Sequence, residues 1–88
     1  MIVQQTSSFI RSTKKLHTNE KQVLDDIVRG IMESPEVGQK KVGDLSSVRV
    51  CKFKIHQTTY RLAYTVEEDL ITLLYFGARQ NFYRDLKR

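Results

Sequence analysis

Only one cysteine and two histidines occur among the 88 residues, and tryptophan is absent. The lone Cys51 excludes an internal disulfide and any metal site built from several cysteines, and it fits a reducing compartment. His17 and His56 lie far apart in the sequence and lack the short spacing that metal ligands usually show. We therefore expect a protein without a metal ion or another cofactor.

Long hydrophobic runs are also missing. No stretch approaches the roughly 20 apolar residues that a membrane-spanning helix requires. The first residues, MIVQQTSSFIRSTKK, lack the basic start and apolar run of a signal peptide. These absences predict a cytoplasmic protein that makes no membrane contact.

Several catalytic motifs are absent as well. The sequence has no phosphate-binding P-loop, no dinucleotide-binding glycine pattern and no serine framed by glycines. Its acidic residues fall on expected helix faces and turns, where carboxylates are usually solvated. Acid–base catalysis by a pair of carboxylates is therefore not expected.

The composition that remains is globular and basic. Hydrophobic residues make up 40% and charged residues 28%, which predicts one domain spanning residues 1–88. The formal net charge is +5. Residues 1–44 carry seven basic and six acidic side chains, whereas residues 45–88 carry eight and four. The positive excess of the second half favours an acidic or polyanionic partner, with nucleic acid as the first candidate.

The first half is predicted to form a strand and two helices. MIVQQ suits a short edge strand, and a short helix is expected from Ser7 or Ser8 to Leu16. In TNEKQVLDDIVRGIMES the apolar residues recur every three or four positions, which indicates one helix face. The two helices, joined near His17, suggest a helical hairpin.

The ends of the second helix can also be predicted. Thr18 or Asn19 can cap its start, because their side chains can accept a backbone hydrogen bond there. Ser34-Pro35 ends it, because a residue before proline is pushed out of helical geometry. The following segment, EVGQKKVGDLSS, has two glycines and no periodicity, and we expect a loop.

From Val48 onward the apolar pattern changes to a period of two, which indicates strands. Cys51 and Phe53 are expected on one face of the first strand, with Lys52 and Lys54 on the other. After a turn near Gln57-Thr58, the next strand, YRLAYTV, repeats the alternation. It places Tyr60, Leu62, Tyr64 and Val66 on one face and Arg61, Ala63 and Thr65 on the other.

The last third continues with an exposed turn, EED, and a third strand. LITLLYF is an almost continuous apolar run, which predicts a strand buried on both faces. Gly77 is expected to break that strand. RQNFYRDLKR then predicts a short terminal helix.

The predicted order of elements defines an α+β fold. We expect a small, twisted, mostly antiparallel sheet, with the N-terminal helical hairpin on one face and a short C-terminal helix. The opposite face is left more open, and Lys52 and Lys54 can point into it.

The candidate site is cationic and aromatic. Lys52 and Lys54 emerge side by side on one strand, Arg61 lies on its neighbour, and Arg79 and Tyr83 follow the Gly77 break. Arginine and lysine bind phosphate oxygens, and an aromatic ring offers a stacking surface for a base. Alternating lysines also commonly protect an exposed strand from aggregation, and this alternative stays open for Lys52 and Lys54.

The order and spacing of these motifs resemble the RelE/ParE superfamily of bacterial toxin–antitoxin toxins. The resemblance covers nearly the whole chain. The KxK pattern, the following YRLxY and a closing Gly-x-Arg with a late tyrosine look like the ribosome-dependent RelE branch. The matching segments are KKL at 14–16, ESPEVGQKKVGDL, VRVCKFKI, YRLAYTV, the hydrophobic strand and GARQNFYRDLKR.

The resemblance implies a metal-independent endoribonuclease that cuts messenger RNA in the ribosomal A site and thereby inhibits translation. The RNA's own 2′-hydroxyl is the nucleophile. By the same resemblance, Lys52 and Lys54 contact the RNA and assist deprotonation, with Lys54 as the base. Arg61 stabilises charge on the scissile phosphate, Arg79 protonates or stabilises the leaving 5′-oxygen, and Tyr83 stacks on a base.

Other residues are given smaller roles. Arg49 and Arg84 add positive charge that can contact RNA without doing chemistry. Cys51 stands where the family often has an aromatic or polar residue, and no function is attached to it. His56 is a minor alternative for the acid or base that some relatives draw from a histidine.

The resemblance also implies a partner and leaves two alternatives. The partner is a small antitoxin, partly disordered when free, that wraps a monomeric toxin; the pair meets operator DNA only through the antitoxin. One alternative is a ParE-like inhibitor of DNA gyrase without nuclease activity. The other is an inactive relative whose basic face serves only its antitoxin.

Overall fold

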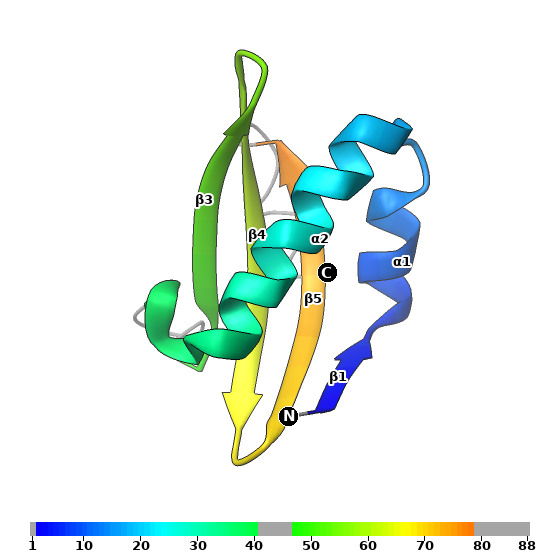
Figure 1. The fold of residues 1–88 in the computed structure, drawn as a ribbon. Coiled ribbons are helices and arrows are strands. Elements are labelled where there is room, and N and C mark those ends of the chain that lie inside the picture. The colour runs from blue at the N-terminus through cyan, green and yellow to red at the C-terminus, as the bar shows by residue number, and fades with distance from the viewer. Residues whose placement is uncertain (1, 41–46, 79–88) are drawn as a thin grey trace.

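The computed structural model describes residues 2–40 and 47–78 of the chain, and they form a five-stranded sheet with two helices on one face (Figure 1). The strands lie in the order β1-β5-β4-β3-β2, and all neighbours are antiparallel except β1 and β5, which are parallel. The predicted mostly antiparallel α+β fold is therefore confirmed. The elements are β1 (Ile2–Gln5), α1 (Ser7–Thr13), α2 (Thr18–Glu33), the 3-10 helix η1 (Pro35–Val37), β2 (Gln39–Lys40), β3 (Arg49–Ile55), β4 (Thr58–Glu67) and β5 (Leu70–Ala78).

Helix α1 is anchored to strand β5 at both ends. The Thr6 hydroxyl caps the helix by accepting the Phe9 N–H at 3.1 Å, and it lies 2.9 Å from the Leu74 carbonyl, to which it can donate. Near the other end, the Ser12 hydroxyl accepts the Phe76 N–H at 3.1 Å. The helix ends at Thr13, earlier than the predicted Leu16.

Helix α2 has the predicted length but a different cap. His17, rather than Thr18 or Asn19, is the N-cap residue, and its backbone N–H donates to the Glu20 carboxylate at 2.8 Å. A glutamate three residues after the cap can satisfy that N–H, which is why the helix starts there. The helix ends before Pro35, as predicted.

The sheet corrects three predictions. The expected loop EVGQKKVGDLSS contains η1 and the short strand β2, which pairs with the start of β3. Strand β5 continues through Gly77 to Ala78, so Gly77 does not break it. Its burial is also one-sided: the residues facing the helices are buried and those between them are half-buried. The turn between β3 and β4 covers His56 and Gln57, close to the predicted position, and His56 has a φ of 58°.

The main hydrophobic core lies between the helices and the sheet. Its buried residues come from α1, α2 and the three long strands: Phe9, Leu24, Ile31, Ile55, Leu62, Tyr64, Ile71, Leu73 and Phe76. A smaller buried cluster, Val48, Val50 and Ala63, lies on the other face. Among residues 2–40 and 47–78 this face carries no helix, and we call it the helix-free face. The predicted division of side chains along β3 and β4 is therefore confirmed.

The predicted C-terminal helix falls on residues 79–88, outside the described residues. Neither α1 nor α2 is long and apolar enough to cross a membrane.

Candidate functional site

Three cations lie together on the helix-free face of β3 and β4. Lys52 is directly opposite Arg61 in the antiparallel register, and Lys54 is opposite Thr59. The two lysines are exposed, and Arg61 is half-buried. They line a surface hollow of about 450 Å³ together with Thr59 and Phe53. We call Lys52, Lys54, Thr59 and Arg61 the cationic face.

The hairpin turn produces this arrangement. The positive φ of His56 allows a tight connection, so residues on the two strands meet in a fixed register. Because side chains alternate along a strand, Lys52 and Lys54 emerge on the same side as Arg61. The cationic face can hold an anion such as a phosphate, since arginine offers a donor fork and lysine a point charge.

The other predicted site residues are distributed differently. Arg79, Tyr83 and Arg84 lie outside the described residues. His56, the alternative base, is exposed in the hairpin turn, where its Nε2 lies 3.4 Å from Asn19 Nδ2, and it does not line the hollow of the cationic face. The predicted roles of these residues in catalysis and RNA binding stay predictions.

Arg49 lies on β3 and holds neighbouring backbone. Its Nη1 donates to the carbonyls of Glu36 at 3.2 Å and Gly38 at 3.0 Å. These bonds tie the segment around η1 to the start of β3. The described geometry thus assigns Arg49 a structural contact, while its predicted contact with RNA stays a prediction.

Tyr64 holds the same segment from inside the core. Its hydroxyl donates to the Pro35 carbonyl and accepts the Gly38 N–H, both at 2.8 Å. A Cβ atom at Gly38 would lie 2.5 Å from that hydroxyl, so the close approach requires glycine. Burial raises the pKa of Tyr64, although the hydrogen bond from Gly38 opposes the shift. Nothing in the sequence pattern distinguishes this tyrosine from an ordinary core residue.

Cys51 is half-buried on the helix-covered side of β3. Burial raises the pKa of its thiol above the ordinary value of 9.0, so it stays protonated at neutral pH. A protonated thiol is a poor nucleophile and a poor metal ligand. Within residues 2–40 and 47–78, no group of three or more His, Cys, Asp or Glu is placed to hold a metal ion.

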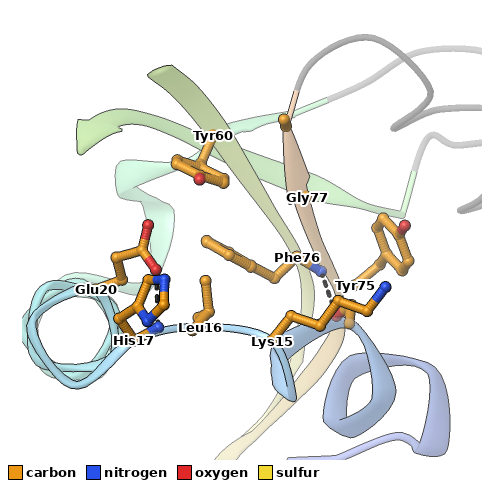
Figure 2. Close-up of a pocket in the computed structure, with 10 residues that line it drawn as sticks. Lys15, Leu16, His17, Glu20, Tyr60, Tyr75, Phe76 and Gly77 are labelled. Carbon is orange, nitrogen blue, oxygen red and sulfur yellow. Dashed lines mark hydrogen bonds between the residues drawn. The ribbon is translucent and has the colours of Figure 1, made fainter. Parts of the chain in front are cut away.

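A second hollow, of about 370 Å³, opens between the turn that joins α1 to α2 on one side and the start of β4 and the end of β5 on the other (Figure 2). Lys15, His17 and Glu20 line one side, and Tyr60 and Phe76 line the other. The two rings are stacked, with centroids 5.0 Å apart. The sequence pattern does not predict this hollow, because its walls come from segments at least 40 residues apart.

Comparison with known proteins identifies the family to which the chain belongs. Residues 3–87 match the model of the ParE-like toxins of type II bacterial toxin–antitoxin systems. The chain therefore belongs to this family, and the superfamily named from the sequence is confirmed. A search of curated protein sequences gave no match.

Solved structures support the same fold. The toxin in the intact E. coli RelBE toxin–antitoxin complex matches with a TM-score of 0.72 and 18% identity, over 90% of this chain and 96% of that one. The isolated E. coli RelE toxin matches with a TM-score of 0.68 and 18% identity, over 99% and 96%. A chain of the RelBE2 complex from Mycobacterium tuberculosis matches with a TM-score of 0.68 and 21% identity, over 89% of this chain and 96% of that one. At these identities the likeness shows the fold alone.

Proposed function

We propose that this protein is an endoribonuclease toxin that cleaves messenger RNA in the ribosomal A site without a metal ion. The observation that carries the proposal is the cationic face, where Lys52, Lys54 and Arg61 meet at one surface hollow. A phosphodiester passing through an in-line displacement develops negative charge on its oxygens. Cations fixed around the phosphate stabilise that charge.

The proposed reaction uses the RNA as its own nucleophile. Lys54 takes the proton of the 2′-hydroxyl, whose oxygen attacks the adjacent phosphorus and forms a cyclic phosphate. The bond to the 5′-oxygen breaks, and that oxygen receives a proton; Arg79 is proposed for this step by family resemblance. Arg61 and Lys52 bind the phosphate oxygens throughout, and Tyr83 is proposed, also by resemblance, to stack on a base.

Dependence on the ribosome has a physical reason. The described residues around the hollow include lysine and arginine but neither histidine nor a carboxylate. Lysine and arginine bind phosphate well and exchange protons poorly near neutral pH. The ribosome would align the message and complete the site, so that cleavage needs an occupied A site.

The proposed partner is a cognate antitoxin in the cytoplasm. Two of the similar structures, RelBE from E. coli and RelBE2 from M. tuberculosis, were solved as toxin–antitoxin complexes. A net charge of +5 favours an acidic binding segment in such a partner. Operator DNA would be bound by the antitoxin, with the toxin contributing only indirectly.

Primer extension on a defined message in a purified translation system tests the proposal. The wild type is expected to cut within the A-site codon only when ribosomes are present. Lys54→Ala and Arg61→Ala should each lose at least about a hundredfold in rate, the scale expected for losing a proton-transfer or charge-stabilising group. Lys21→Ala, which removes the same charge from the exposed side of α2, is the matched control and should cut normally.

The second candidate function is inhibition of DNA gyrase, and the observation that favours it is the ParE-like description of the matching family. An uncut message in the presence of wild-type protein would overturn the ribonuclease proposal. The same preparation would then be added to a gyrase supercoiling assay. Loss of supercoiling would establish the gyrase function, and no effect in either assay would favour an inactive relative.

A further inference from the structure

The sheet register extends the cationic face onto β5. Lys52 is opposite Arg61, and Arg61 is opposite Gly77, so these positions form one row across three strands. The next row on the same face of the sheet consists of Val50, Ala63 and Tyr75. Side chains at paired positions share a face, so Tyr75 lies on the helix-free face beside the cations.

The side chain of Tyr75 lies along β5 toward Gly77. A Cβ atom at Gly77 would be 2.9 Å from Tyr75 Cε2 and 3.6 Å from its hydroxyl oxygen. The ring therefore occupies the space that a side chain at position 77 would fill. The ring therefore fills the β5 position of the row that contains Lys52 and Arg61. It can lie there because residue 77 is glycine and has no side chain.

A further cation comes from a distant segment. Lys15, in the turn between α1 and α2, lines the same hollow as Tyr75 and Gly77. Figure 2 shows Tyr75 on the opposite side of β5 from Tyr60 and Phe76, with Lys15 extending toward that side. The half-buried ring of Tyr75 thus lies over Gly77, which is paired with Arg61 on β4, and it shares a hollow with Lys15.

We propose that Tyr75 is a base-stacking residue of the RNA-binding site, flanked by phosphate contacts from Arg61 and Lys15. This inference rests on the proposed ribonuclease function and adds a residue to it. Single-stranded RNA is bound where cations follow its backbone and an aromatic ring accepts a base. Tyr75 offers such a ring at a fixed position, because the adjacent apolar cluster of Val48, Val50 and Ala63 supports it.

The simpler interpretation is that Tyr75 only covers this apolar cluster. A leucine could do the same, so Tyr75→Leu separates the two roles. If the ring only covers the cluster, the variant loses stability at most and binds RNA normally. If the ring stacks on a base, the variant loses RNA affinity while its melting temperature changes little.

The experiment uses the full chain and a short single-stranded RNA with one 2-aminopurine, whose fluorescence is quenched when it stacks on an aromatic ring. A 2′-deoxy sugar at that nucleotide prevents attack on the phosphate that follows it. Wild type and Tyr75→Phe are expected to quench the probe on binding. Tyr75→Leu should bind about tenfold more weakly and leave the probe unquenched. Gly77→Ala should weaken quenching, because its methyl group displaces the ring.

Tyr60→Leu is the matched control, since it makes the same change on the helix-covered side of the sheet, and it should quench normally. Equal binding and quenching by wild type and Tyr75→Leu would overturn the inference, as would a wild type that does not bind the probe. Primer extension in parallel separates this result from the proposed function. A wild type that quenches the probe but leaves messages uncut would contradict the ribonuclease alone.

Discussion

Among the described residues, the cluster between the helices and the sheet has nine buried side chains, six of them from the sheet, whereas the cluster on the helix-free face has three. The first cluster includes large residues such as Leu62, Tyr64 and Phe76. The second consists of two valines and an alanine beside three cations. Most apolar burial, and so most hydrophobic stabilisation, therefore lies on one face, which leaves the other free to carry charge.

This difference has a consequence for mutations. Exposed lysines contribute little to folding, so selection can place them for binding. Residues of the helix-covered face are constrained by packing instead. We expect substitutions on the two faces to separate stability from RNA binding, and four predictions follow.

Leu62→Ala is expected to have the largest effect on stability. Leu62 is completely buried beneath the helices, and its truncation should lower the free energy of unfolding by about 2–5 kcal/mol. Urea unfolding followed by circular dichroism measures the loss. Val50→Ala, from the small cluster of the helix-free face, should lose clearly less. Equal losses would contradict the proposed difference between the faces.

Tyr64→Phe is expected to have the next largest effect. The change leaves the Gly38 N–H and the Pro35 carbonyl without their hydroxyl partner, which should cost about 1–3 kcal/mol. Faster hydrogen exchange at the Gly38 amide would locate the effect. Tyr60→Phe is the control. A similar loss of stability in that variant would show that the lost hydrogen bonds to Pro35 and Gly38 do not explain the effect of Tyr64→Phe.

The same tyrosine should also affect stability in alkali. Its pKa is raised above 10.0 in the folded state, so the unfolded chain ionises first as the pH rises past that value. The contribution of Tyr64 is therefore complete below pH 10 and is lost as the pH rises through the folded pKa. Unfolding curves in a Cys51→Ala background, which removes the thiol that titrates nearby, should show a steeper alkaline loss with Tyr64 than with phenylalanine.

The smallest effect on stability is expected on the cationic face. Lys52→Gln combined with Lys54→Gln should change the free energy of unfolding by no more than about 0.5 kcal/mol per site, because both side chains are exposed. The double variant should nevertheless lose cleavage in the primer-extension assay. A loss of stability comparable to that of Leu62→Ala would show that the lysines serve folding instead.

Much of the fold could be predicted because it follows from local periodicity. The alternation of Cys51, Phe53 and Ile55 with Lys52 and Lys54 assigned both faces of β3, and the apolar stripe of α2 assigned its buried side. Short elements without a periodic signal were missed. Strand β2 has two residues and forms because it pairs with β3, and His17 caps α2 through a glutamate three residues later.

The candidate site could be predicted only in part, for a similar reason. Lys52, Lys54 and Arg61 were predicted to lie on one face because they sit on two strands joined by a short turn. Tyr75 was interpreted as part of a strand buried on both faces, since an apolar run carries no information about which face each ring lies on. Its place beside Arg61 depends on the register between β4 and β5 and on the missing side chain of Gly77.

The sequence by itself therefore determined the α+β class, the sidedness of β3 and β4, the excess of positive charge in the second half and the family of the chain. The first three properties follow from side-chain periodicity and composition, which are local features of the sequence, whereas the family follows from a resemblance in the order and spacing of short motifs. The tertiary structure alone decided which distant residues meet: Lys15 with Tyr75 at one hollow, and Tyr64 with the backbone of Pro35 and Gly38. Such meetings depend on register and packing between segments far apart in the chain, and no local pattern encodes them.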